Sequence, residues 1–245
     1  IFQGVREQFV DNQPAGNDLV YAHPDMPARM GSFFLEGKKV RWQSAGGHSI
    51  LFDGRVTDTA LLLKEGVING PLVKQGYFCW NIIKREEKIG VRFRNTNSAA
   101  VRNFKGVSRF GVDLKWKLTA TLVPNEQGGI AVSNVLGQTN LEKSPGKLLF
   151  SIQGIQYSLD ALDEGGDDLF IIFGDDTNQD ETYPSGRFIY VKKPGADGKT
   201  EIDFNRAINP PCAFTDFATC PLPPRQNILP VPITAGEKNF SLKAK

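Results

Sequence analysis

The feature that most constrains the fold is the alternation of apolar and polar side chains at every second residue. Leu114–Ala120 alternates cleanly, and Val91–Arg94 repeats the pattern. A period of two places alternate side chains on opposite faces of a strand, whereas a helix needs a period of about 3.6. Turn-forming pairs such as Gly46-Gly47 and Asp53-Gly54 separate the short apolar segments. The sequence therefore predicts an all-β fold, a sandwich or partly open barrel with short helical turns.

Two strand predictions follow from apolar runs in the second half of the chain. Leu148–Ile152 and Gln156–Leu159 flank a turn at Gly154, which indicates a hairpin. Leu169–Phe173 is apolar without interruption. Such a run is typical of a strand that is buried on both faces.

Two further elements are predicted from weaker patterns. Arg187–Val191 and Thr200–Phe204 bracket a loop at Lys193–Gly198, and we expect them to pair as a hairpin with a long tip. The best helix candidate is Thr59–Glu65, which Gly66 would end.

Length and charge limit the class of protein. The chain has 245 residues, a length that permits one large or two modest domains. Its net charge is +2. We expect a small β-rich module over residues 1–123 and a β-sheet module over 124–245, which could also pack as one domain.

The charges are interleaved, so nucleic acid is not an expected partner. No apolar run reaches the roughly 18 residues of a transmembrane segment. Residue 1 is Ile rather than Met, which is compatible with a mature or trimmed chain.

The most specified segment is Asp203–Pro224, which holds two of the three cysteines and five prolines. A disulfide between Cys212 and Cys220 would contribute about 2–3 kcal/mol by reducing the entropy of the unfolded chain. We expect this disulfide first, a reduced structural pair second and a nucleophilic Cys212 third. A metal site would need further ligands, and His23 and His48 are both distant in sequence.

The redox state of this pair bears on the compartment. A disulfide requires an oxidising environment outside the cytoplasm, whereas reduced cysteines suit the cytoplasm. The third cysteine, Cys79, lies in the apolar run Tyr77–Trp80. We interpret it as a small buried hydrophobic residue.

A polar cluster precedes the proline-rich loop. The strand period places Asp203 and Asn205 on one face, followed by Arg206, and Arg187 opposite them would form a bidentate contact with Asp203. One interpretation is the floor of a pocket for an anionic ligand. The other, which we favour, is a buried network that holds the proline-rich loop to the sheet, because proline lacks a backbone donor.

Arginines on the first module form a second candidate site. Arg92 and Arg94 share a strand face, which would suit carboxylate or phosphate recognition. The alternative interpretation is an exposed, charged sheet face. The sequence contains no nucleophile elbow, phosphate-binding loop, zinc-protease motif or dinucleotide fingerprint. We therefore assign no catalytic residue and no cofactor.

The acidic loop Asp175–Glu181 carries the spacing Asp-x-Asn-x-Asp from Asp176. Oxygen ligands at alternate positions are typical of a calcium loop. The sixth position is Glu181 rather than glycine, and the twelfth is Arg187 rather than glutamate. We expect a solvated turn rather than a metal site, with a non-standard calcium loop as the alternative.

A series of ordered motifs in the second half carries a family resemblance. These motifs are Thr182-Tyr183, Gly186-Arg187-Phe188, Ile202–Ala207, Asn209–Phe214, Cys220–Pro224, Asn227 and Ala235–Lys238. Similar motifs in the first half are Gly31–Phe33, Ile83–Arg85, Gly90–Arg92, Phe104–Gly106 and Trp116. Together they resemble the bacterial and archaeal family known as domain of unknown function 1684. The resemblance implies a fold family but no established substrate or reaction.

A weaker resemblance concerns the first module. Gly16–Val20 followed by Gly31–Phe33 is similar to the strand order of forkhead-associated domains, which bind phosphothreonine. The Ser-x-x-His of those domains is absent, since the corresponding stretch reads Met26–Gly31. This resemblance therefore implies a strand order and no phosphopeptide site.

These observations lead to two hypotheses about function. The first is a non-catalytic binding or structural module that recognises a small anionic ligand or a protein partner. The second is an enzyme of unrecognised class that places Arg187, Asp203, Asn205 and Glu237 around a pocket. The enzyme hypothesis requires these four side chains to converge on a concave, water-accessible site.

Overall fold

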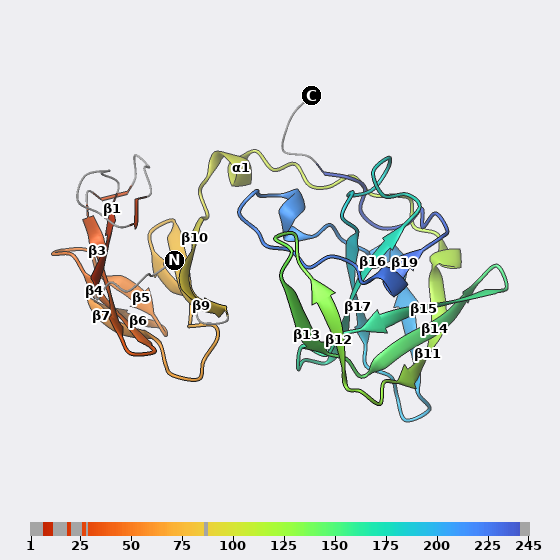
Figure 1. The fold of residues 1–245 in the computed structure, drawn as a ribbon. Coiled ribbons are helices and arrows are strands. Elements are labelled where there is room, and N and C mark those ends of the chain that lie inside the picture. The colour runs from red at the N-terminus through yellow and green to blue at the C-terminus, as the bar shows by residue number, and fades with distance from the viewer. Residues whose placement is uncertain (1–6, 12–18, 21–25, 28, 86–87, 241–245) are drawn as a thin grey trace. The chain divides into compact units, whose positions relative to one another are not determined.

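The computed structural model describes residues 7–11, 19–20, 26–27, 29–85 and 88–240. Strands dominate these residues, and within them no sheet closes on itself (Figure 1). The predicted all-β fold is confirmed, in its sandwich form. The chain divides into two compact units, Ile1–Phe104 and Lys105–Lys245. None of the described helices is long and apolar enough to cross a membrane.

The first unit consists of short strands and one helical turn. They are β1 (Glu7–Asp11), β2 (Leu19–Val20), β3 (Arg29–Glu36), β4 (Lys39–Ser44), β5 (Ile50–Phe52), β6 (Arg55–Thr57), β7 (Thr59–Leu63), β8 (Val73–Gln75), β9 (Phe78–Arg85), β10 (Lys88–Asn95) and α1 (Ala99–Arg102). They form two sheets with the orders β2-β1-β3-β4-β7 and β10-β9-β8-β5-β6.

Aromatic side chains join the two sheets of the first unit. The ring of Trp42 on β4 lies 4.8 Å from that of Phe33 on β3 and 5.1 Å from that of Trp80 on β9. The indole N–H of Trp42 donates to the hydroxyl of Ser44 at 2.9 Å, so this buried polar group is satisfied. Cys79 is a buried free cysteine, as predicted.

The predicted helix at Thr59–Glu65 is wrong, because Thr59–Leu63 forms strand β7. Ala60 and Leu62 are buried while Thr59 and Leu61 are exposed, which is a period of two. β7 pairs with β4 and satisfies the backbone groups along its edge. A helix of this length would be only marginally stable by itself, so pairing with the sheet determines that this segment is a strand.

The second unit contains three sheets and several short 3₁₀ turns. Its elements are η1 (Leu114–Trp116), β11 (Lys117–Pro124), β12 (Gly129–Ser133), β13 (Thr139–Lys143), β14 (Gly146–Ile152), β15 (Ile155–Ala161), β16 (Asp168–Asp175), β17 (Arg187–Lys192), β18 (Lys199–Asp203), η2 (Phe204–Arg206), η3 (Pro211–Ala213), η4 (Arg225–Asn227) and β19 (Ile228–Leu229). The sheet orders are β15-β14-β11-β18, β12-β13 and β17-β16-β19.

Strand β16 separates two hydrophobic cores. Ile171 and Phe173 face the main core, whereas Phe170 and Ile172 face a smaller core that also contains Cys220. The predicted strand at Leu169–Phe173, buried on both faces, is therefore confirmed. In the main core, Phe204 packs edge-on against Phe173, with ring centroids 5.3 Å apart.

One of the two predicted hairpins is correct. β14 and β15 pair antiparallel across Gln153-Gly154, as expected. The expected pairing of Arg187–Val191 with Thr200–Phe204 is wrong, because β17 pairs with β16 and β18 pairs with β11. The Lys193–Gly198 loop is therefore a corner between sheets. β17 pairs with the strand just before it, whereas the partner of β18 is distant in sequence, and a local pattern does not reveal either choice.

The expected boundary after residue 123 falls at the end of β11. This strand pairs with β14 and β18, both in the second unit. The division between the compact units lies earlier, after Phe104. Gly16–Asp18, which carry part of the forkhead-like resemblance, lie outside the described residues, as does His23.

Candidate functional site

The centre of the predicted cluster is Arg187, whose side chain is 0% exposed. Its Nη2 donates to Asp175 Oδ2 at 2.7 Å and to the carbonyl of Ile233 at 2.9 Å. Its Nη1 donates to the carbonyl of Ala235. The expected contact with Asp203 is therefore replaced by a buried pair with Asp175. Arg187 holds the segment after the proline-rich loop to strand β17.

Asp175 completes this buried network. Its Oδ1 accepts hydrogen bonds from the amide of Thr177 at 2.9 Å, the hydroxyl of Thr177 at 2.6 Å and the amide of Ile233 at 3.1 Å. Burial lowers the pKa of Arg187 from its ordinary value, and the adjacent Asp175 carboxylate opposes that shift. Buried charges are stable when paired and hydrogen-bonded, as they are here. A dissolved ligand does not reach Arg187 in this arrangement.

Glu237 ties the end of the chain to the start of the proline-rich loop. Its carboxylate accepts from the backbone amide of Asn209 at 2.7 Å and from Arg109 Nη1 at 3.0 Å. The Asn209 side chain in turn donates to the carbonyl of Lys238 at 2.9 Å. These bonds anchor the backbone immediately before Pro210, as the structural interpretation predicts.

Asp203 and Asn205 form a separate, local arrangement. The Asp203 carboxylate caps η2 by accepting from the backbone and side-chain amides of Asn205 at 3.1 and 2.9 Å. The Asn205 side chain also pairs with both backbone groups of Asp113, at 3.0 and 2.9 Å. Arg206 is exposed. Among the sequence-predicted residues, Arg187, Asp203, Asn205 and Glu237 thus make hydrogen bonds that hold chain segments together.

Glycine at position 236 permits this arrangement. Its φ is +75°, and a Cβ there would lie 2.7 Å from the carbonyl oxygen of Ala207 and 2.8 Å from the Ala207 Cβ. A side chain would therefore force apart the segments that Glu237 joins.

Replacing Gly236 by alanine is expected to destabilise the protein more than replacing Gly198. Gly198 has a similar φ of +71°, but a Cβ there meets nothing within 4 Å. Gly198→Ala isolates the backbone strain, about 1 kcal/mol, and Gly236→Ala adds overpacking of at least about 1 kcal/mol. Urea unfolding of the two variants measures the difference. Equal losses would contradict the packing argument.

The acidic loop after β16 satisfies its own polar groups. Asn178 Oδ1 accepts from the amide of Asp175 at 2.7 Å, and Asn178 Nδ2 donates to Thr182 and Tyr183 at 2.9 Å. Among the described residues, no group of three or more His, Cys, Asp and Glu side chains is placed to hold a metal ion. The loop is an internally bonded turn.

Arg92 and Arg94 lie on β10 in the first unit, and both are exposed. Arg94 donates to the side-chain oxygen of Asn81 on β9 at 3.1 Å. Anion binding by this pair stays a prediction. Both arginines belong to the first unit, whereas Arg187 belongs to the second.

Cys212 and Cys220 form the predicted disulfide, with their Cα atoms 6.1 Å apart. The closed loop between them presents Phe217, which is 97% exposed. Phe214, in the same loop, packs against Phe240 with ring centroids 4.9 Å apart and ring planes tilted by 32°. One aromatic ring thus fixes the loop to the protein, and the other points to solvent.

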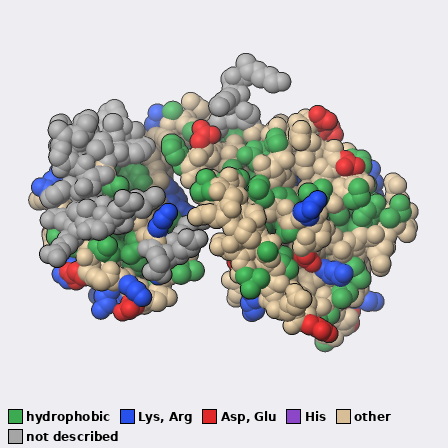
Figure 2. All heavy atoms as spheres, viewed as in Figure 1, with side chains coloured by type: hydrophobic (Ala, Val, Ile, Leu, Met, Phe, Trp, Pro, Cys, Tyr) green, Lys and Arg blue, Asp and Glu red, His purple; other side chains and the backbone are tan. Residues whose placement is uncertain are grey.

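The tip of the β12–β13 hairpin lies beside this loop. The amide of Val135 donates to the carbonyl of Cys220 at 3.1 Å, and Leu222 donates to Ser133 at 2.7 Å. Val135 and Leu136 at the tip are both exposed. We call Val135, Leu136 and Phe217 the loop surface. On the visible face of the second unit, charged side chains of both signs are interspersed with apolar ones (Figure 2).

Sequence reasoning missed several of the residues that matter most. Asp175 was assigned to a solvated acidic loop, although it lies only two residues after the buried apolar run Leu169–Phe173. That position was the signal that it could be buried. Arg109 gave no signal, and Asn209 was noted only as part of a motif, because the partners of both residues are distant in sequence.

The second unit is thus an all-β module whose proline-rich segment is held by a disulfide and a buried Asp–Arg network. A family described as "Protein of unknown function (DUF1684)" matches residues 102–238. The chain belongs to this family. The match begins at Arg102, so the first-half motifs before it lie outside the matched range, whereas those of the second half lie within it.

The solved structures that are similar to this chain include one from an archaeon. It is the solution NMR structure of an uncharacterized protein from Haloarcula marismortui, with 30% sequence identity. The similarity covers 56% of this chain and 78% of that one, with a TM-score of 0.47. No curated protein matches the sequence.

Proposed function

We propose that the second unit is a non-catalytic binding module that recognises a protein partner through the loop surface. The observation that carries the proposal is Phe217, 97% exposed on a disulfide-closed loop. Exposed aromatic side chains are frequent anchors of protein interfaces, where they enter apolar pockets of the partner. The partner is therefore expected to present such a pocket.

The loop is preorganised for this role. The disulfide closes it, and Pro210-Pro211 and Pro221 restrict the backbone on both sides. A rigid loop loses little conformational entropy on binding, so more of the contact energy appears as affinity. Val135 and Leu136 are further exposed apolar side chains, at a hairpin tip that is hydrogen-bonded to Cys220.

The enzyme hypothesis has less support. Arg187 is fully buried, and Asp203, Asn205 and Glu237 are engaged in bonds that hold chain segments together. An active site needs these groups around a water-accessible cavity. The described pocket of the second unit is lined by other residues.

Site-specific crosslinking tests the proposal. The photoreactive residue p-benzoylphenylalanine replaces Phe217 in one variant and Ile155 in a control, and each is irradiated in an extract of the source cells. Ile155 is also exposed, at 60%, but lies on β15. We expect a discrete protein adduct at position 217 that is absent at position 155.

The partner identified in the adduct is then purified, and its affinity for the wild-type protein and for two variants tests the role of Phe217. Phe217→Ser is expected to weaken binding by about 2 kcal/mol, as for an interface anchor, and Ile155→Ser should leave it unchanged. The proposal is wrong if both positions give the same adducts or if Phe217→Ser binds as tightly as wild type. An adduct between two copies of this chain would instead indicate self-association.

A further inference from the structure

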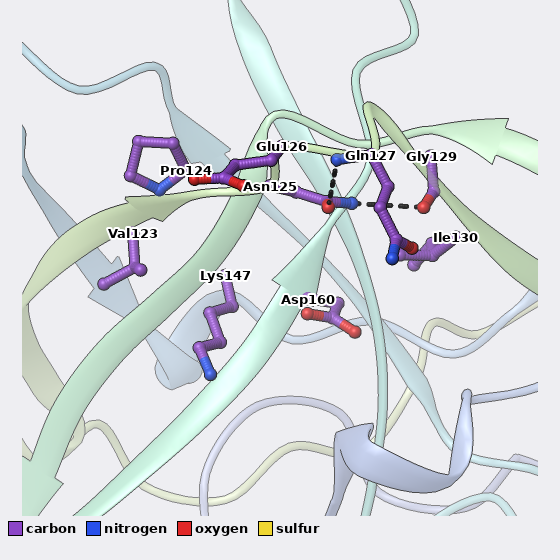
Figure 3. Close-up of a pocket in the computed structure, with 9 residues that line it drawn as sticks. All are labelled: Val123, Pro124, Asn125, Glu126, Gln127, Gly129, Ile130, Lys147 and Asp160. Atoms are coloured by element: carbon purple, nitrogen blue, oxygen red, sulfur yellow. Dashed lines mark hydrogen bonds between the residues drawn. The ribbon is translucent and has the colours of Figure 1, made fainter.

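A second candidate site lies on the outer face of the four-stranded sheet. A pocket of about 450 Å³ is bounded by the turn after β11 and by side chains of β14 and β15 (Figure 3). This volume is in the range of small-molecule sites. The pocket does not include the loop surface or the Arg187 network.

Strand register creates the pocket floor. Val123 pairs with Lys147, and Lys147 pairs with Asp160, so the three side chains form a row across β11, β14 and β15. The adjacent row, on the opposite face of the sheet, includes Leu148 and Leu159 and is buried in the main core. Period two thus directs Lys147 and Asp160 outward into the pocket.

The walls of the pocket are held in place. The Asn125 side chain accepts from the amide of Gln127 at 3.0 Å and donates to the carbonyl of Gly129 at 3.1 Å, which fixes the turn. The buried Asn227 side chain pairs with both backbone groups of Asp160, at 2.7 and 3.0 Å. The pocket therefore needs little ordering when a ligand binds.

The two charged side chains on the pocket floor, Lys147 and Asp160, can each interact with a ligand. Lys147 and Asp160 are directly opposite in the register, yet no bond joins them in Figure 3. Gln226 donates to Asp160 Oδ2 at 2.6 Å, so within the described part of the chain Oδ1 is the carboxylate oxygen open to a further donor. Val123 and Ile130 add apolar surface beside the charges.

We propose that this pocket binds a small zwitterion of the α-amino-acid class. The ligand carboxylate pairs with the Lys147 ammonium, and the ligand ammonium pairs with the Asp160 carboxylate. An aliphatic side chain would contact Val123 and Ile130. Each charged contact is a charge-assisted hydrogen bond, which is stronger than a neutral one.

NMR titration with three matched ligands tests this inference. They are L-leucine, 4-methylpentanoate, which lacks the ammonium, and 3-methylbutylamine, which lacks the carboxylate. Leucine is expected to shift the backbone amide signals of Gln127, Gly129, Lys147 and Asp160. Each fragment should bind about tenfold more weakly, as for one lost charge-assisted hydrogen bond.

Variants separate the site from general surface charge. Lys147→Gln and Asp160→Asn should each weaken leucine binding by about tenfold. Lys199→Gln, on β18 of the same sheet but outside the pocket, should leave it unchanged. Wild-type amide spectra elsewhere in each variant show that the fold is intact. Absence of shifts at millimolar leucine, equal binding of a fragment, or unchanged binding by Lys147→Gln would overturn the inference.

Discussion

Replacing Arg187 by methionine is expected to lower the free energy of unfolding by about 3–5 kcal/mol, the cost of removing one partner of a buried ion pair. Methionine keeps much of the side-chain length but leaves the Asp175 carboxylate buried without its cation. It also removes the donors to the carbonyls of Ile233 and Ala235. The loss is measured by urea denaturation, following NMR amide signals of the second unit.

Lys192→Met is a matched control on the same strand. Lys192 pairs with Asp168 at 2.7 Å, the distance at which Arg187 pairs with Asp175, and both pairs join β17 to β16. The difference is exposure, since Lys192 is 74% exposed and the Arg187 side chain is fully buried. An exposed pair contributes little because water solvates both charges and mobile side chains lose entropy. The stability of Lys192→Met should therefore match wild type.

A double variant tests the coupling itself. If Arg187 and Asp175 act as a pair, the effects of Arg187→Met and Asp175→Asn will not add, because each alone already breaks the same interaction. Additive losses would mean that the two side chains stabilise the fold independently. A loss in Arg187→Met as small as in Lys192→Met would contradict the network's structural role.

Local pattern was sufficient for the fold class because the period of two survives in most strands. Leu169–Phe173 was predicted as buried on both faces, and β16 lies between two cores. The pattern gave wrong predictions where the pairing of strands determines the structure. Thr59–Leu63 is a strand because β4 offers an edge, and β17 and β18 pair with β16 and β11 instead of each other.

The structural role of the candidate site was predicted from the sequence, but the side-chain partners within it were not. Charged and amide residues around a proline-rich loop indicated a structural network, since proline lacks backbone donors. The partner of Arg187 was wrong, because Asp203 is adjacent in the expected hairpin whereas Asp175 is adjacent in the actual sheet. Side-chain partners follow strand pairing, so an error in pairing becomes an error in the site. Nothing in the local sequence distinguished Phe217 from the buried Phe204.

Removing the disulfide is the second large effect that we expect. Cys212→Ala/Cys220→Ala should lose about 2–3 kcal/mol of stability, because the unfolded chain regains the entropy that a short closed loop denies it. Cys220 is buried in the smaller core beside Phe170 and Phe188, so a small packing loss adds to this value. The loss is read from urea unfolding of oxidised wild type and of the double variant.

Reductant provides the control. Wild type treated with dithiothreitol should approach the stability of the double variant, whereas the double variant itself should not respond. Cys79, buried in the first unit, forms no disulfide and should not contribute to the redox dependence. Unchanged stability of wild type after verified reduction of the pair would refute the entropic argument. The same reduction should also lower the affinity for a partner that binds Phe217, because an open loop must be ordered before it can present the ring.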